Sequence, residues 1–193
     1  MAVIGDSFTS GSPQGGRGDK GWPRLITTQL NAQGMNLVTD VGAEGASGYV
    51  NIGHGGGVFF DKIAKRVKKE DRLVVFFGSI NDSKATPGEL AHATCDTLRN
   101  AEEAAPMARF IVVGPSWANA DPPDYIRRSR DILRDRAASL GAKFIDPLED
   151  RWFVDNPELI GKDGVHPTDA GHEYIAAKLK PIIEQELTDT PAP

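Results

Sequence analysis

The sequence has 193 residues and a formal net charge of −5, with 39% hydrophobic and 25% charged residues. This length suits one domain with a sizeable core, and the composition is that of an ordinary globular protein. The negative charge argues against nucleic acid as a partner, and no apolar run approaches the ~20 residues of a membrane-spanning helix. The oligomeric state stays open.

The two ends of the chain bear on its setting. No signal peptide precedes the strand-like residues that begin at Ala2, so the default expectation is a cytoplasmic protein. The abrupt start would also fit a trimmed chain, either secreted or part of a larger protein. Residues 189–193 have the composition of a flexible tail or linker, which leaves 1–188 as a single domain.

The first part of the chain predicts a strand, a loop, a helix and a second strand. The apolar run 2–5 is typical of a buried strand, and it ends in a glycine, an aspartate and a serine at 5–7. The glycine-rich stretch 8–21 predicts a loop. A proline then suits the first turn of a helix over 23–31, and a short second strand is expected over 37–41.

The middle of the chain continues the alternation. Residues 42–57 are dense in glycine and too long for a simple turn, which is typical of a functional loop. A helix is expected over 59–67, and 72–77 predicts a strand buried on both faces. Threonine, proline and glutamate at 86–89 form a helix start with a capping box, and another strand is expected over 110–113.

The last third completes the pattern. A helix is predicted to start at Asp121 and to end near Gly141, followed by a last strand over 143–145. An irregular segment, 146–167, leads to a final helix from Thr168. Five strands alternating with helices predict an α/β protein, in which an open parallel sheet has helices on both faces.

In such a sheet the loops that follow the strands gather at one edge, where ligands bind. Four segments should therefore meet there: Ser7, the loop 42–57, and the residues after Phe77 and after Val113. A serine at this edge becomes a nucleophile only if a base takes its proton and donors receive the charge that forms on the substrate.

His166 is the candidate base. Asp163 lies three residues earlier and can bond to its Nδ1, which fixes the tautomer and stabilises the imidazolium. His54, in a glycine-rich loop, could reach the site and is a candidate substrate contact. The His and Asp pair lacks a second ligand pair at a suitable spacing, so no metal is predicted. Two histidines are expected to have no catalytic role, His92 and His172.

Donors for an oxyanion can be named on three segments. One is the backbone N–H of Ser7, and another comes from the loop 44–48, where glycine lets the backbone approach a ligand closely. The third is the side-chain amide of Asn81, which follows the third strand. Trp117, at the end of the fourth strand, could stack on a sugar ring or simply pack.

These blocks together resemble those of the SGNH (GDSL-type) hydrolases. The resemblance rests on Gly5-Asp6-Ser7, a glycine within 42–48, Asn81-Asp82 and Asp163-x-x-His166, which stand in the family's order over nearly the whole chain. Two departures exist: Ser79 occupies a glycine position of the third block, and Gly42-Ala43-Glu44 stands where the second block usually begins with asparagine.

The resemblance implies a flavodoxin-like three-layer α/β/α sandwich and no cofactor, with 1–188 as the catalytic domain. It implies Ser7 as the nucleophile, His166 as the base and Asp163 as its orienting acid. The implied oxyanion donors are the N–H of Ser7, the N–H of Gly48 and the amide of Asn81, with Gly45 as the alternative glycine. The candidate substrate contacts are Asp6, Gly45, His54 and Trp117, with Asp6 also interpreted as a residue that shapes the turn by hydrogen bonding.

The implied reaction is ester hydrolysis through an acyl-enzyme. The polar, glycine-rich loops and the lack of an apolar lid helix favour a small acyl group such as acetyl, on a polar alcohol such as a sugar. A small-molecule or glycan ester is therefore the expected partner. The alternatives are a lysophospholipase- or thioesterase-type lipid acyl hydrolase, a sugar O-acyltransferase domain, and a catalytically silent binding or structural module on the same fold.

Overall fold

The computed structural model describes residues 1–189, which fold around one five-stranded sheet. All neighbouring strands are parallel, and their order is β2-β1-β3-β4-β5. The strands are β1 (Ala2–Gly5), β2 (Asp40–Ala43), β3 (Leu73–Phe77), β4 (Arg109–Val113) and β5 (Lys143–Ile145). Every residue of β1 and β3 is buried, as expected for strands covered on both faces.

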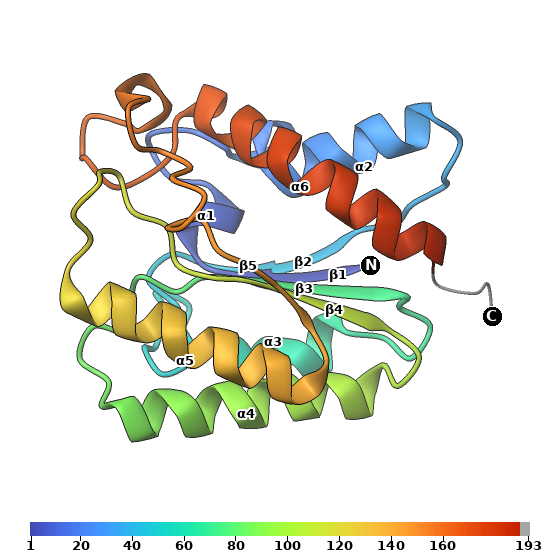
Figure 1. The fold of residues 1–193 in the computed structure, drawn as a ribbon. Helices are drawn as coiled ribbons and strands as arrows, with labels where there is room; N and C mark the ends of the chain where they lie inside the picture. The colour runs from blue at the N-terminus through green and yellow to red at the C-terminus, as the bar shows by residue number, and fades with distance from the viewer. Residues whose placement is uncertain (190–193) are drawn as a thin grey trace.

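Helices cover both faces of the sheet, which confirms the predicted three-layer α/β/α fold (Figure 1). One layer contains α1 (Ser7–Ser10), α2 (Trp22–Ala32) and α6 (Asp169–Asp189). The other contains α3 (Phe59–Arg66), α4 (Pro87–Ala104) and α5 (Asp124–Leu140). Two 3₁₀ turns, Gly18–Lys20 and Pro157–Leu159, lie in the connecting loops.

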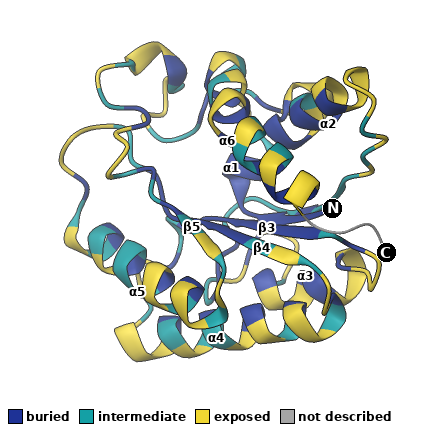
Figure 2. Cartoon of the chain, turned by 45° about the vertical axis from the view of Figure 1, so that its right-hand side comes forward, coloured by how far each residue is buried: buried dark blue, intermediate teal, exposed yellow. Residues whose placement is uncertain are grey.

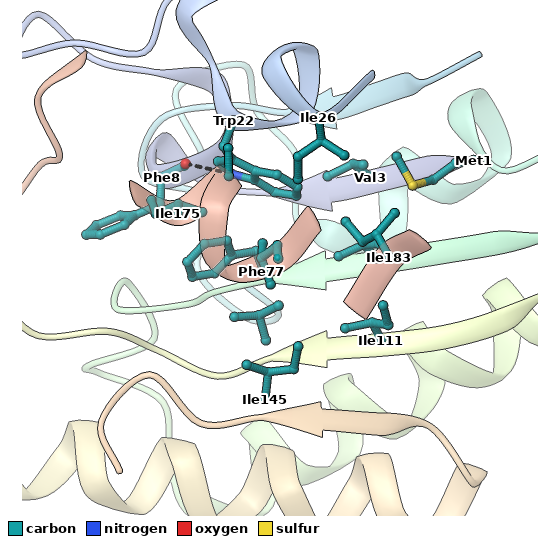
Figure 3. Packing of buried hydrophobic residues seen from close by; sticks show 14 of the residues in the cluster. Met1, Val3, Phe8, Trp22, Ile26, Phe77, Ile111, Ile145, Ile175 and Ile183 are labelled. Atoms are coloured by element: carbon teal, nitrogen blue, oxygen red, sulfur yellow. Dashed lines mark hydrogen bonds between the residues drawn. The ribbon is translucent and has the colours of Figure 1, made fainter. Parts of the chain in front are cut away.

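The strands divide their side chains between two cores. In β3, Leu73, Val75 and Phe77 face the α2 and α6 layer, whereas Val74 and Phe76 face the α3, α4 and α5 layer. Figure 2 shows β3 buried, with exposed residues at the starts of β4 and β5, while the outer faces of the helices are exposed. Figure 3 shows the first core, where Trp22 donates its indole N–H to the carbonyl of Phe8 at 3.0 Å.

Local signals explain several helix ends. Thr86 and Glu89 form the predicted capping box at the start of α4, with Pro87 in its first turn. Gly141 ends α5 with φ = 71°, a left-handed conformation that favours glycine. The helix α5 starts at Asp124, later than predicted from Asp121, because Pro122 and Pro123 hold the preceding backbone extended.

Two other predictions were wrong in detail. The second strand covers 40–43 instead of 37–41, because the side chain of Asn31 binds the backbone N–H and C=O of Leu37, which removes that residue from the ladder. The segment 8–21 is not all loop, because Ser7 to Ser10 form a helical turn that is too short to show a periodicity in sequence.

The last helix continues through Pro181 and reaches Asp189, a residue that the sequence placed in the tail. The rest of that predicted tail, 190–193, lies outside the described residues. Within residues 1–189, no helix has the length and apolar character needed to cross a bilayer.

Candidate active site

Ser7, which follows β1, lies at the edge of the sheet where the parallel strands end. Strand β1 ends at Gly5, and α1 begins two residues later at Ser7. Asp6 caps this helix, because its Oδ1 accepts the N–H of Phe8 at 2.8 Å. A Cβ at Gly5 would lie 2.3 Å from the Thr9 hydroxyl, so glycine lets the helix turn back tightly over the strand. The N–H of Ser7, in the first turn, has no acceptor within the helix.

Three side chains form a continuous hydrogen-bonded series. The Oγ of Ser7 lies 3.0 Å from Nε2 of His166, and Nδ1 of that histidine lies 2.7 Å from Oδ2 of Asp163. Ser7 is only 5% exposed, whereas the side chains of His166 and Asp163 are 28% and 34% exposed. The predicted nucleophile, base and acid are thus brought together from positions 159 residues apart.

The segment before α6 fixes the histidine. Oδ1 of Asp163 accepts the backbone N–H groups of Val165 and His166 at 2.9 and 3.0 Å, and Gly164 makes the turn with φ = 72°. Burial raises the pKa of Asp163, but hydrogen bonds from the His166 N–H, its imidazole and the Val165 N–H outweigh burial and hold that pKa below its usual value. The carboxylate therefore stays charged beside the imidazole.

Asn81 follows β3 and meets the end of β1, its neighbour in the sheet. Its Nδ2 donates to the carbonyl of Ser47 at 2.9 Å and lies 3.3 Å from Oδ2 of Asp6. Asp6 therefore touches both the helix that carries Ser7 and the predicted oxyanion amide. The structure brings Asn81 into the group, as the sequence predicted.

The two candidate glycines differ. The N–H of Gly48 donates to the carbonyl of Asn51 at 2.9 Å, so in this structure it is already used and does not fit the predicted role of oxyanion donor. Glycine is needed there for another reason, because a Cβ would lie 2.4 Å from the carboxylate of Asp82. Gly45, the alternative, lies in a turn against Gly5, and no acceptor for its N–H is found within residues 1–189.

Asp82 organises the loop in a way that sequence reasoning missed. Its buried carboxylate accepts three backbone N–H groups, from Tyr49 at 3.1 Å, Val50 at 2.9 Å and Asn51 at 2.8 Å. Burial raises its pKa, and these hydrogen bonds oppose the rise. These three N–H groups lie more than 30 residues from Asp82 in sequence. The only sign of the contact in the sequence is Gly48, next to Tyr49, because a glycine lets two segments approach closely.

Asp6 and Asp82 are two buried carboxyl groups close to one another. Asp6 is 1% exposed, and burial raises its pKa to about 7. The hydrogen bond from Phe8 lowers this pKa, and the nearby charge of Asp82 raises it further. Near neutral pH, Asp6 is therefore divided between its protonated and ionised forms.

The remaining predicted contacts differ in where they lie. His54 is exposed and lies against Gly45, whose carbonyl accepts the His54 N–H at 3.0 Å. Trp117 is half-buried with its ring edge-on to Tyr125 of α5, which favours the packing interpretation. His172 is fully buried, and its Nδ1 accepts the backbone N–H of Trp22. Burial lowers the pKa of this histidine to about 4.

A cavity of about 350 Å³ adjoins Asn81 and Asp82. Val50, Ile52 and Ala85 give it apolar walls, and the polar residues around it are Asn51, Lys84 and Glu89. Among the described residues, no group of three or more His, Cys, Asp or Glu side chains is arranged to hold a metal ion.

Comparison with known sequences gives two findings. The model of the GDSL-like lipase/acylhydrolase family matches residues 3–174. The GDSL lipase Rv0518 of Mycobacterium tuberculosis is 48% identical over 190 residues, which cover 97% of this chain and 82% of that protein.

Solved structures share the fold at low identity. TesA has a TM-score of 0.76 at 18% identity, with 96% of this chain and 98% of that chain covered. A family two carbohydrate esterase from Clostridium thermocellum, solved with cellohexaose, has a TM-score of 0.75 at 15% identity, with 97% and 64% covered. At these identities the two structures support the fold alone.

Proposed function

The chain belongs to the GDSL-like lipase/acylhydrolase family of carboxylic ester hydrolases, and from this membership we propose that Ser7, His166 and Asp163 are its catalytic triad. The observation that carries the proposal is the hydrogen-bonded series from Ser7 Oγ through the imidazole to the Asp163 carboxylate. Ser7 attacks the ester carbonyl while His166 takes its proton and then passes it to the leaving alcohol. Water, activated by the same imidazole, then releases the acid.

The oxyanion is held by donors that follow three strand ends, those of β1, β2 and β3. Ser7 contributes its backbone N–H and Asn81 its side-chain amide. One hydrogen of that amide is bonded to the Ser47 carbonyl at 2.9 Å, and the other makes a longer contact of 3.3 Å with Asp6, which the oxyanion would replace. We assign the third donor to the turn that contains Gly45, in place of Gly48, because the Gly48 N–H is bonded to Asn51. Loss of one such donor typically slows kcat about 10²–10³-fold.

For the substrate we propose an ester of a small acyl group, such as acetyl, on a polar alcohol such as a sugar. The partial exposure of His166 and Asp163 supports an open site that a bulky polar alcohol can reach. Asn51, Lys84 and Glu89 around the neighbouring cavity offer hydrogen-bonding groups to such an alcohol.

A lipid acyl hydrolase is the second candidate. Ile52 is 65% exposed and lines the cavity beside Asn81 together with Val50 and Ala85, which supports contact with an acyl chain. The name of the 48% identical relative, a GDSL lipase, points the same way. The sugar O-acyltransferase alternative would use the same acyl-enzyme with a sugar hydroxyl in place of water.

The test of the mechanism compares p-nitrophenyl acetate hydrolysis by the wild type and by Ser7→Ala. Alanine fits the buried position without new contacts, so we expect an equally stable protein whose kcat has fallen at least about 10³-fold. Equal rates above the uncatalysed background would reject the triad, and the absence of turnover by the wild type would leave the silent-module alternative.

The substrate class is tested separately. Release of acetate from acetylated sugars is compared with release of fatty acid from lysophospholipids, and p-nitrophenyl acetate with the octanoate. We expect the acetyl esters to have the higher kcat/KM. A strong preference for octanoate and lysophospholipid would replace the first candidate by the second.

A further inference from the structure

A buried serine hydroxyl lies where the loop after β3 meets the loop after β2. Ser79, which directly follows Gly78 after β3, is 1% exposed. Its Oγ accepts the backbone N–H of Asn81 at 2.8 Å and donates to the carbonyl of Ser47 at 3.3 Å.

Asn81 is held at three points. Its backbone N–H is bonded to Ser79, and its side-chain amide donates to the carbonyl of Ser47 at 2.9 Å and to Asp6 at 3.3 Å. That carbonyl also accepts the Ser79 hydroxyl, so a single acceptor joins Ser79, Asn81 and the turn of residues 44–47.

We propose that Ser79 is a positioning residue, whose hydroxyl holds the Asn81 amide and the 44–47 turn in one arrangement for oxyanion binding. The inference rests on the proposed function. It follows from the need for donors that are already oriented when charge develops, since reorientation during the reaction would add to the barrier. Ser79 itself does not touch the reacting atoms; it acts through Asn81.

Removal of the hydroxyl leaves the Asn81 N–H without its acceptor in a partly buried position. The backbone of residues 79–82 then relaxes, and the Asn81 amide loses its fixed direction. An interaction made only in the transition state affects kcat more than KM. We therefore expect Ser79→Ala to lower kcat about tenfold, with KM changed less than twofold.

Ser116→Ala is the matched control. Ser116 follows β4 at the same edge of the sheet and is 2% exposed, but its Oγ has no hydrogen-bond partner within residues 1–189. Loss of this equally buried hydroxyl should leave kcat and KM unchanged. Melting temperatures of both variants show that each is folded, and Ser79→Gly replaces Ser79→Ala if the latter fails to fold.

A double-mutant cycle tests whether Ser79 acts through Asn81. Asn81→Ala alone should lower kcat about 10²–10³-fold, and adding Ser79→Ala to it should change kcat less than twofold further. Independent tenfold losses in both backgrounds would overturn the proposal, as would a Ser79→Ala enzyme with the wild-type kcat.

A second readout does not depend on activity. The side-chain amide resonances of Asn81, assigned by their loss in Asn81→Ala, should shift or broaden in Ser79→Ala and stay in place in Ser116→Ala. Unchanged resonances in Ser79→Ala would reject the positioning role. A wild type that hydrolyses no ester would instead reject the proposed function, and the resonances would still decide whether Ser79 fixes the amide.

Discussion

At the scale of single residues, the buried carboxyl group of Asp6 makes the stability of the folded protein depend on pH. It is buried between the start of α1 and the amide of Asn81, and burial raises its pKa from 3.8 to about 7. The folded state therefore keeps a proton on Asp6 at pH values where the unfolded chain releases it. This group contributes its full stability below pH 3.8, and the contribution is lost as the pH rises towards 7.

The predicted measurement compares Asp6→Asn with the wild type. The shift corresponds to about 4 kcal/mol at most, so the stability of Asp6→Asn relative to the wild type should rise by up to that amount between pH 4 and pH 7. Urea unfolding at several pH values gives the two curves. Asp135→Asn, at an exposed position of α5, is the control and should run parallel to the wild type. Parallel curves for Asp6→Asn would contradict the buried, protonated Asp6.

At the scale of elements, the glycine-rich segment 11–21 is fastened to the start of α6. The N–H of Gly16 donates to Asp169 at 3.0 Å, and Lys20 pairs with the same carboxylate at 2.5 Å. Gly16 also lies directly against the buried imidazole of His172, where a Cβ would lie 1.9 Å from Nε2. The loop beside Ser7 is thus held by the helix that follows His166.

Gly16→Ala should therefore be much more harmful than Gly18→Ala. Both glycines have positive φ, 76° and 59°, so both substitutions carry backbone strain of about 1–2 kcal/mol. Only Gly16 adds a steric clash, of about 1–3 kcal/mol, because nothing lies within 4 Å of a Cβ at Gly18. Thermal unfolding of the two variants measures the difference, and equal melting temperatures would show that the loop does not pack on His172.

The elements also show what a sequence can and cannot predict. Periodicity and capping residues located α4 closely, and the run of five buried residues identified β3. The Asp163 and His166 pair was predictable because its geometry is local. The bonds from Asp82 to the backbone of residues 49–51 were not predictable, since they join segments over 30 residues apart in sequence. The bond from the Gly48 N–H to the Asn51 carbonyl is local, but it lies in an irregular loop whose turn the sequence pattern does not specify.

At the scale of the whole molecule, the single sheet contributes side chains to both hydrophobic cores. Neighbouring residues of β3, such as Val74 and Val75, pack into opposite layers, so neither layer can come apart without exposing the strand that the other one uses. A sheet shared in this way favours a single cooperative unfolding transition.

The prediction is that tryptophan fluorescence and far-ultraviolet circular dichroism give coincident urea transitions. Two of the three tryptophans, Trp22 and Trp152, are buried in the core beneath α2 and α6, so most of the fluorescence change reports that layer, whereas circular dichroism reports the helices of both layers. A fluorescence midpoint well below that of circular dichroism would contradict it, because the α2 and α6 layer would then open independently.

The distance along the chain between Ser7 and His166 has a consequence for the order of events during synthesis. At about 5–20 residues per second, the 159 positions between them take roughly 8–32 s to translate. Throughout that interval the proposed nucleophile is already made but its proposed base is not. The proposed triad can therefore form only late in synthesis, when the segment before α6 docks against α1, and until then the unfinished chain lacks the base that the proposed mechanism requires.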